Sequence, residues 1–171
     1  MKSVLISIQP KWCELIASGK KTVEVRKTKP KLEPPFKCYI YCTKGKGDCL
    51  WRWNGIWYDT QDPKHRPNRL DGKVIGEFVC DVVITAEHGR YVVLNAHDTR
   101  IESLDLCDYA DGKTVYGWHI SDLKIYDHPK KLSEFRAHNV RTYTDEKGYL
   151  VPTHEMTRPP QSWCYVEEGG E

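Results

Sequence analysis

Charged side chains of opposite sign gather in one short segment, residues 19–26, with the sequence GKKTVEVR. In an extended strand alternate side chains share a face, so Glu24 and Arg26 would be neighbours opposite Val23 and Val25. On spacing alone this is an exposed ion pair of about 0–1 kcal/mol. If the same face lines a cleft, the basic groups would hold anionic or carbonyl groups while the carboxylate accepts protons or hydrogen bonds.

Two lysines precede this strand, and alternation assigns them to different faces. Lys20 shares the face of Glu24, whereas Lys21 does not, provided that the strand extends that far. A strand that begins only near Thr22 would let both lysines reach the cleft from its entrance. Both therefore remain candidate ligand-binding residues.

Further polar and aromatic residues could complete such a cleft, and each is also compatible with a purely structural role. A lysine beside a helix N-terminus suggests an anion bound there. Lysines that flank a strand would meet phosphate, and aromatic, amide and basic side chains would stack on a base or hydrogen-bond to it. These candidates are Ser7, Lys11, Tyr41, Lys44, Trp118, His119, Arg158, Gln161 and Trp163.

The spacing of the seven cysteines gives little support for a metal site or a cysteine nucleophile. Cys38 and Cys42 would lie roughly 13 Å apart along one strand, too far for one metal ion. Cys49 and His65 add no C-x-x-C pair, so we expect no metal. A Cys–His pair such as Cys42 with His119 has no motif behind it, the Walker spacing is missing, and no cofactor is expected.

Short strands dominate the periodicity, with one clear helix. Alternation predicts strands at residues 2–8 and 22–27, and Pro10 begins a helix between them that Gly19 ends. Further strands are predicted at residues 37–43, 73–85, 116–126 and 162–166, and short helical segments at 102–109 and 132–135. The order indicates an α+β, mainly β fold: a small, mostly antiparallel β-barrel with the helix at its side or mouth.

Two stretches lack clear periodicity. Residues 44–71 form a Trp-rich insertion, in which Asn54 and Gly55 lie between two aromatic arms and predict a hairpin turn. Residues 136–157 are polar and predicted to be irregular. Neither stretch reads as a separate domain, so residues 1–171 are predicted to form a single one.

The charge balance is nearly neutral, with 26 basic and 24 acidic residues and a net charge of +2. This excludes a protein that coats nucleic acid by overall charge, so such binding would need a local patch. Basic residues crowd near the N-terminus: Lys11, Lys20, Lys21, Arg26, Lys27, Lys29 and Lys31. No apolar run approaches the ~20 residues that cross a bilayer. With no signal peptide, we expect a cytoplasmic protein with reduced thiols.

The pattern G-x-K-x-x-E-x-R, after a strand and a proline-started helix, resembles the signature of the ASCH domain in the PUA-like superfamily. It matches at Gly19, Lys21, Glu24 and Arg26. The blocks PPFKCYIYCTKGKG, GKVIGEFVCD, YGWHISDLKIYD and RPPQSWCYVEE follow in an order similar to a branch from intestinal bacteria and their phages. The resemblance implies a PUA-like β-barrel whose cleft, beside the first helix, binds RNA or a modified nucleoside.

One branch of small ASCH proteins hydrolyses the acetyl amide of N4-acetylcytidine. The resemblance implies a base at Lys21 and a threonine nucleophile at the position of Glu24, and this chain lacks that threonine. The expected function is therefore binding of RNA or a modified nucleotide. Two alternatives stay open: a hydrolase of an acylated nucleoside or of RNA, with Lys21 and Glu24 as acid–base pair, and an accessory protein that acts through a protein partner. The sequence leaves the oligomeric state open.

Overall fold

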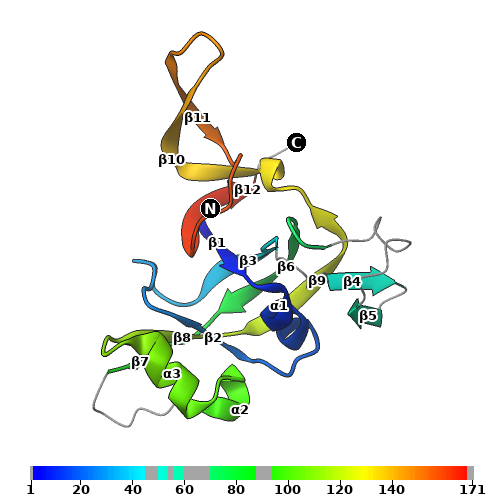
Figure 1. Ribbon diagram of the computed structural model, residues 1–171, viewed down its shortest axis with the longest axis vertical. Coiled ribbons are helices and arrows are strands. Elements are labelled where there is room, and N and C mark those ends of the chain that lie inside the picture. The colour runs from blue at the N-terminus through cyan, green and yellow to red at the C-terminus, as the bar shows by residue number, and fades with distance from the viewer. Residues whose placement is uncertain (1, 45–49, 54–55, 60–69, 88–93, 169–171) are drawn as a thin grey trace.

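The computed structural model (Figure 1) describes residues 2–44, 50–53, 56–59, 70–87 and 94–168. Strands predominate within these residues, as the sequence predicts, and the α+β, mainly β class is confirmed. The α-helices are α1 (Pro10–Ala17), α2 (Ala96–Thr99) and α3 (Ser103–Ala110), and a 3₁₀ turn, η2, spans Leu132–Glu134. The predicted helical segments correspond to α1, α3 and η2, whereas α2 was not predicted.

Seven strands form a mixed sheet in the order β11-β10-β12-β1-β3-β6-β9. Their bounds are β1 (Ser3–Ile8), β3 (Phe36–Cys42), β6 (Val74–Cys80), β9 (Ser121–Lys130), β10 (Phe135–Thr144), β11 (Leu150–Glu155) and β12 (Trp163–Glu168). β1 pairs in parallel with β3 and antiparallel with β12, and all of its residues are buried. The first predicted strand is thus a central strand of this sheet.

Three further strands form a second sheet in the order β2-β8-β7, with bounds β2 (Val23–Arg26), β7 (Val83–Ala86) and β8 (Val115–His119). The chain passes between the two sheets from β6 to β7 and from β8 to β9. At these corners the His119 amide donates to the Val82 carbonyl (3.0 Å) and the Ile120 amide to the Thr22 carbonyl (2.8 Å). Among the described residues the ladders form separate sheets rather than one closed barrel.

The single strands predicted over residues 73–85 and 116–126 were therefore wrong, because each is two strands in different sheets. Apolar residues continue through both corners, since the two sheets share one core. That cluster combines Ile6 and Ile40 of the large sheet with Trp118 of the small one. The hydrophobic pattern of a sequence indicates which residues are buried. Residues on both sides of each corner are buried, so the pattern does not mark the corner.

A small separate sheet pairs β4 (Leu50–Trp53) with β5 (Ile56–Asp59). These strands bear out the hairpin predicted within residues 44–71. Asn54 and Gly55, at its turn, lie outside the described residues.

The prediction that residues 136–157 are irregular was wrong. They form most of an antiparallel hairpin, β10–β11, which projects from the body of the molecule (Figure 1). Tyr143 pairs with Val151, and the register shifts between Arg136 and Arg141. Most described side chains near the tip, including Tyr149 and Leu150, are exposed. With solvent on both faces, the strands need no alternation of apolar and polar residues, so the prediction failed.

A third apolar cluster positions the helical segment against the small sheet. Val23, Val25 and Val115 pack there with Leu94 and Ala110, the last residue of α3. The side chain of Leu104 in α3, by contrast, is 80% exposed. The cluster, against which Leu106 also packs, therefore fastens α3 beside β2.

Candidate ligand-binding site

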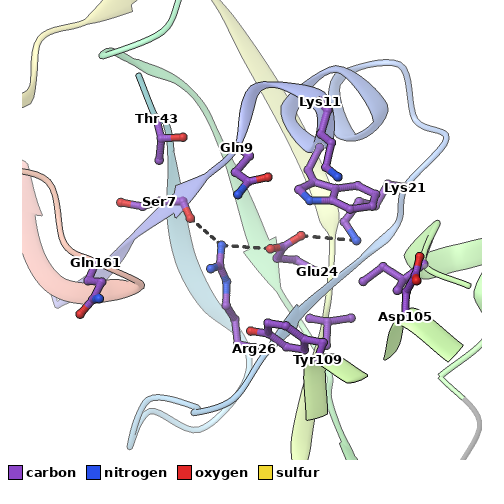
Figure 2. Close-up of a pocket in the computed structure, with 13 residues that line it drawn as sticks. Ser7, Gln9, Lys11, Lys21, Glu24, Arg26, Thr43, Asp105, Tyr109 and Gln161 are labelled. Carbon is purple, nitrogen blue, oxygen red and sulfur yellow. Dashed lines mark hydrogen bonds and ion pairs between the residues drawn. The ribbon is translucent and has the colours of Figure 1, made fainter. Parts of the chain in front are cut away.

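A cavity of about 530 Å³ lies between α1, β2 and α3 (Figure 2). This volume falls within the range of about 300–1,000 Å³ that is usual for small-molecule sites. Charged residues of β2 line one side, and α1, α3 and the ends of β1 and β3 contribute the remaining walls. The strand that the sequence singled out thus borders a cavity.

The turn between α1 and β2 decides which lysine enters the cavity. Gly19 ends the helix with a left-handed φ of 72°, a conformation that favours glycine. The Lys21 amide donates to the Leu15 carbonyl (2.9 Å), and the strand begins only at Val23. Strand alternation therefore does not reach Lys21. Its side chain is buried beside Glu24, whereas that of Lys20 is exposed.

The Glu24 carboxylate bridges two cations. Its Oε2 lies 3.4 Å from Lys21 Nζ and its Oε1 lies 3.0 Å from Arg26 Nη2. The Lys21, Glu24 and Arg26 side chains are 1%, 7% and 12% exposed, so the trio is almost sealed from water and Arg26 is its most open member. Two positive charges and one negative charge leave a net charge of +1. This favours an anionic or carbonyl group at the open end.

Lys21 has partners on several sides. Its ammonium donates to the carbonyl of Thr99 at 2.5 Å and lies 5.0 Å from the centre of the Trp12 ring. Burial lowers the pKa of Lys21, and the neighbouring Glu24 carboxylate only partly offsets this effect. The uncharged amine of Lys21 therefore forms at a lower pH than that of a free lysine.

Arg26 connects the small sheet to the large one. Its Nη2 donates to the Ser7 carbonyl of β1 at 2.7 Å, and Figure 2 shows this contact in line with the Glu24 and Lys21 pairs. Ser7 in turn donates from its hydroxyl to the Pro160 carbonyl at 2.6 Å. This sequence of contacts places Gln161 at the cavity wall.

The opposite wall comes from α3 and the residues before it. Ile101, Asp105 and Tyr109 line the cavity. The pKa of Tyr109 is raised by burial and by the nearby Glu24 carboxylate, and the Arg26 guanidinium only partly offsets this rise. Arg100, which has a left-handed φ of 57°, donates from Nε to the Lys20 carbonyl at 2.6 Å and so holds this segment against the start of β2.

The rim near α1 carries polar groups. Gln9, Lys11 and Thr43 line it, and Lys11 Nζ lies 4.5 Å from the centre of the Trp12 ring. Gln9 precedes the helix without capping it through its side chain, so its amide stays available to a ligand.

Six of the residues predicted from the sequence line this cavity: Ser7, Lys11, Lys21, Glu24, Arg26 and Gln161. Three others lie elsewhere. Lys20 and Lys44 are exposed outside it. Tyr41 is buried on the other face of the large sheet with Val74 and Phe135, because it follows Ile40 along β3 and so points away from the shared core.

The remaining four candidates do not line the cavity. Trp118 is fully buried in the core, and β-sheet pairing places it directly opposite Glu24. His119 Nδ1 lies 2.7 Å from Asp81. Arg158 is exposed, and Trp163 donates from Nε1 to the Thr28 hydroxyl at 2.9 Å.

Sequence reasoning missed several lining residues: Gln9, Trp12, Val25, Thr43, Ile101, Asp105 and Tyr109. Trp12 directly follows Lys11, which was a candidate. Ile101, Asp105 and Tyr109 lie in a segment without a motif. Only their packing against β2, far away in the chain, brings them to the site.

The described residues contain no group of three or more His, Cys, Asp or Glu side chains placed to hold a metal ion. Cys49 and His65, which entered the zinc hypothesis, lie outside the described residues. Burial raises the pKa of both Cys13 and Cys38 well above the ordinary value, which keeps these thiols protonated and unreactive. Of the described helices, none has the length and apolar character needed to span a membrane.

Known structures show the same fold. The chain is similar to the crystal structure of ASCH from Zymomonas mobilis, with a TM-score of 0.60 and 18% identity over 96% of this chain and 87% of that chain. A tyrosine-to-phenylalanine variant of that protein matches with the same score and identity over 98% and 91% of the two chains. A serine-to-alanine variant matches over 96% and 88%. At this identity the likeness concerns the fold alone.

The family follows from the sequence. Residues 6–150 match the family model of the ASCH domain, which covers most of the chain. The chain therefore belongs to the ASCH domain family. A search of curated proteins gave no match.

Proposed function

We propose that this protein binds RNA through a nucleotide or modified nucleoside that enters the cavity beside β2. The observation that carries this proposal is the trio of Lys21, Glu24 and Arg26, nearly sealed by protein and with one net positive charge. Membership of a family with a PUA-like fold, which is often linked to RNA binding, supports the same class of ligand.

The other walls of the cavity suit a nucleoside. Trp12 and Tyr109 offer aromatic surface for a flat base, and Gln9 and Gln161 can both donate and accept hydrogen bonds at its edges. Arg26 would meet the anionic or carbonyl group. Asp105 would accept a hydrogen bond from an amino group and would repel phosphate on its side.

Binding is favoured over catalysis because the potential acid–base pair is already engaged. Both carboxylate oxygens of Glu24 face cations, and the Lys21 ammonium faces Thr99 and Glu24 while being only 1% exposed. A ligand would have to displace these partners before either group could act on it. Arg26 also has partners in Glu24 and Ser7, but it is the most exposed of the three, and the aromatic walls need no such rearrangement.

The test compares binding of nucleoside monophosphates and short labelled single-stranded RNAs to four proteins, by calorimetry and fluorescence anisotropy. Arg26→Met and Tyr109→Leu should each weaken binding by roughly 10-fold or more, because charge-assisted hydrogen bonds and base stacking each contribute about 1–3 kcal/mol. Lys20→Met, whose lysine is exposed outside the cavity, should bind like the unmodified protein.

Circular dichroism spectra and unfolding midpoints would confirm that the variants are folded. If Arg26→Met and Tyr109→Leu bind every ligand like the unmodified protein, or if no RNA or nucleotide binds at all, the proposal is wrong.

A second candidate function, hydrolysis, is favoured by one observation: burial lowers the pKa of Lys21, which eases its use as a general base. In this case Glu24 would activate water, since a hydroxyl nucleophile is absent from its position. Incubation with N4-acetylcytidine and with labelled RNA, followed by chromatography, tests both substrates. Turnover that Glu24→Gln abolishes would support hydrolysis, whereas product no greater than with Glu24→Gln would retire it.

A further inference from the structure

Three exposed lysines follow β2 directly: Lys27, Lys29 and Lys31. Within the part of the chain that the structure describes, none of them forms an ion pair with a carboxylate. The overall charge is almost balanced, so three neighbouring cations without acidic partners form a local basic patch. It lies next to Arg26 of the cavity.

The backbone of this loop is held by aromatic residues of β12. Trp163 donates from Nε1 to the Thr28 hydroxyl at 2.9 Å, and the Lys31 amide donates to the Tyr165 hydroxyl at 2.7 Å. Pro30 is buried between these contacts. The loop is therefore anchored while its lysine side chains remain exposed.

Aromatic rings lie beside two of these lysines. Lys27 Nζ lies 4.9 Å from the ring centre of Tyr109, a cavity residue, and Lys29 Nζ lies 5.6 Å from that of Tyr116. Further along, the rings of Trp163 and Tyr165 are 5.4 Å apart. We call this set the lysine–aromatic stripe: Lys27, Lys29, Lys31, Tyr109, Tyr116, Trp163 and Tyr165.

We propose that the lysine–aromatic stripe is the path of a single-stranded RNA that has one nucleotide in the cavity. The inference rests on the proposed function and extends it from a nucleotide to a strand. Each nucleotide presents one phosphate and one flat base, which matches a surface that carries both cations and partly exposed rings. An acidic peptide would satisfy the lysines but would offer nothing flat to the rings.

The charges on the two sides of the cavity favour one route for the RNA strand over the surface. The exposed residues Glu102, Asp105 and Asp108 lie on or next to α3 and make that wall acidic. Phosphates would be repelled there and attracted on the side of Lys27. A strand that leaves the cavity would therefore run over the stripe and away from the acidic part of α3.

The experiment uses the full chain and a labelled single-stranded RNA of about 10 nucleotides, within the range of about 4–16 that such sites cover. The variant K27Q/K29Q/K31Q removes the three lysine charges of the stripe. Its matched control, K124Q/K131Q/K147Q, removes three exposed lysine charges elsewhere. Affinity is measured at several salt concentrations, for the RNA and for a nucleoside monophosphate that binds the cavity.

We expect the stripe variant to bind the RNA more weakly and the monophosphate unchanged. The slope of the logarithm of the RNA binding constant against the logarithm of the salt concentration should decrease in magnitude by about 2. Each phosphate of a single strand that a lysine neutralises contributes about 0.7 to this slope. The control should change neither. A DNA strand of the same sequence should bind more weakly than the RNA.

Trp163→Leu tests the aromatic part of the stripe. We expect it to weaken RNA binding roughly 5- to 150-fold, the range for loss of one stacked base, at an unchanged salt slope. Its circular dichroism spectrum would show whether the fold is retained. Thr28→Val removes the same hydrogen bond but leaves the ring, so it should bind RNA like the unmodified protein if stacking on Trp163 is what matters.

The outcomes separate the two proposals. If the monophosphate binds but the RNA binds no more tightly, or if the stripe and control variants behave alike, the stripe is refuted while the cavity stands. RNA binding that depends on the three stripe lysines but not on Arg26 would support the stripe and refute the cavity. Equal binding of DNA, or complete competition by polyglutamate, would also overturn the assignment to RNA.

Discussion

The Lys21 ammonium and the Thr99 carbonyl are joined by a 2.5 Å hydrogen bond, although these residues lie 78 positions apart in the chain. A second bond, from the Thr22 amide to the Asp98 carbonyl (2.9 Å), runs beside it. Together they fasten α2 to the start of β2. The two walls of the cavity are therefore held by the same lysine that pairs with Glu24.

Lys21→Met should destabilise the protein strongly. The substitution removes the donor to Thr99 and leaves Glu24 with one of its two cations. Removal of one partner from a buried ion pair typically costs about 3–5 kcal/mol, and the remaining contact to Arg26 places the expected loss near 3 kcal/mol. Urea unfolding measures it. Lys20→Met should stay within about 0.5 kcal/mol, and equal midpoints for the two variants would contradict this role of Lys21.

The same lysine predicts a rise in stability on the alkaline side. Burial lowers the pKa of Lys21 from its ordinary value of 10.5, so the native state releases this proton at a lower pH than the unfolded chain. Between the two pKa values the unfolded state binds more protons, and stability increases with pH. The free energy of unfolding of the unmodified protein should therefore rise relative to that of Lys21→Met as the pH approaches 10.5. A difference that falls with pH would refute the shift.

Glu77 predicts a loss of stability in acid. Burial raises its pKa, but the hydroxyl of Tyr126 (2.5 Å) and the ammonium of Lys37 (3.2 Å) outweigh that effect and hold the pKa below the ordinary 4.5. The resulting stability is present above pH 4.5 and is lost as the pH falls through the folded-state pKa. Thermal unfolding over this interval should show a smaller loss for Glu77→Gln, and Glu146→Gln, at an exposed site, should behave like the unmodified protein.

Gly117 tests how closely the helical segment packs on the small sheet. A Cβ atom there would lie 2.5 Å from Leu94 Cδ2 and 2.9 Å from Val23 Cγ1. Overpacking of this kind costs about 1–3 kcal/mol. Gly117→Ala should therefore lower the free energy of unfolding.

The double variant Gly117→Ala/Leu94→Ala identifies the cause. Shortening Leu94 removes the nearest atom, so the double variant should lose less than the sum of the two single losses in chemical unfolding. Strict additivity would show that Leu94 is not the residue against which the new methyl group packs.

The segment from β1 to β2 could be predicted closely from the sequence, because alternation, Pro10 and Gly19 mark its element boundaries. The position of Lys21 was ambiguous for a physical reason. Strand alternation applies only from Val23 onward, and the backbone of the turn before it is set by a hydrogen bond to Leu15. The family resemblance favoured the lysine that the structure places in the cavity.

The opposite wall of the cavity could not be predicted. Tyr109 and Asp105 reach the site only because the third apolar cluster holds the helical segment against Val23 and Val25. Such contacts depend on packing between distant parts of the chain, which no local pattern reports. Trp118 illustrates the converse: this aromatic residue in a conspicuous block is buried in the core, on the strand next to Glu24.

The pairing of β1 with β12 has a consequence for synthesis on the ribosome. Both faces of β1 are buried, yet its antiparallel neighbour is made about 160 residues later. At about 5–20 residues per second, the nascent chain carries an apolar strand with an open edge for roughly 8–30 s. We therefore expect the demand for chaperones to be greatest while the middle of the chain is being translated.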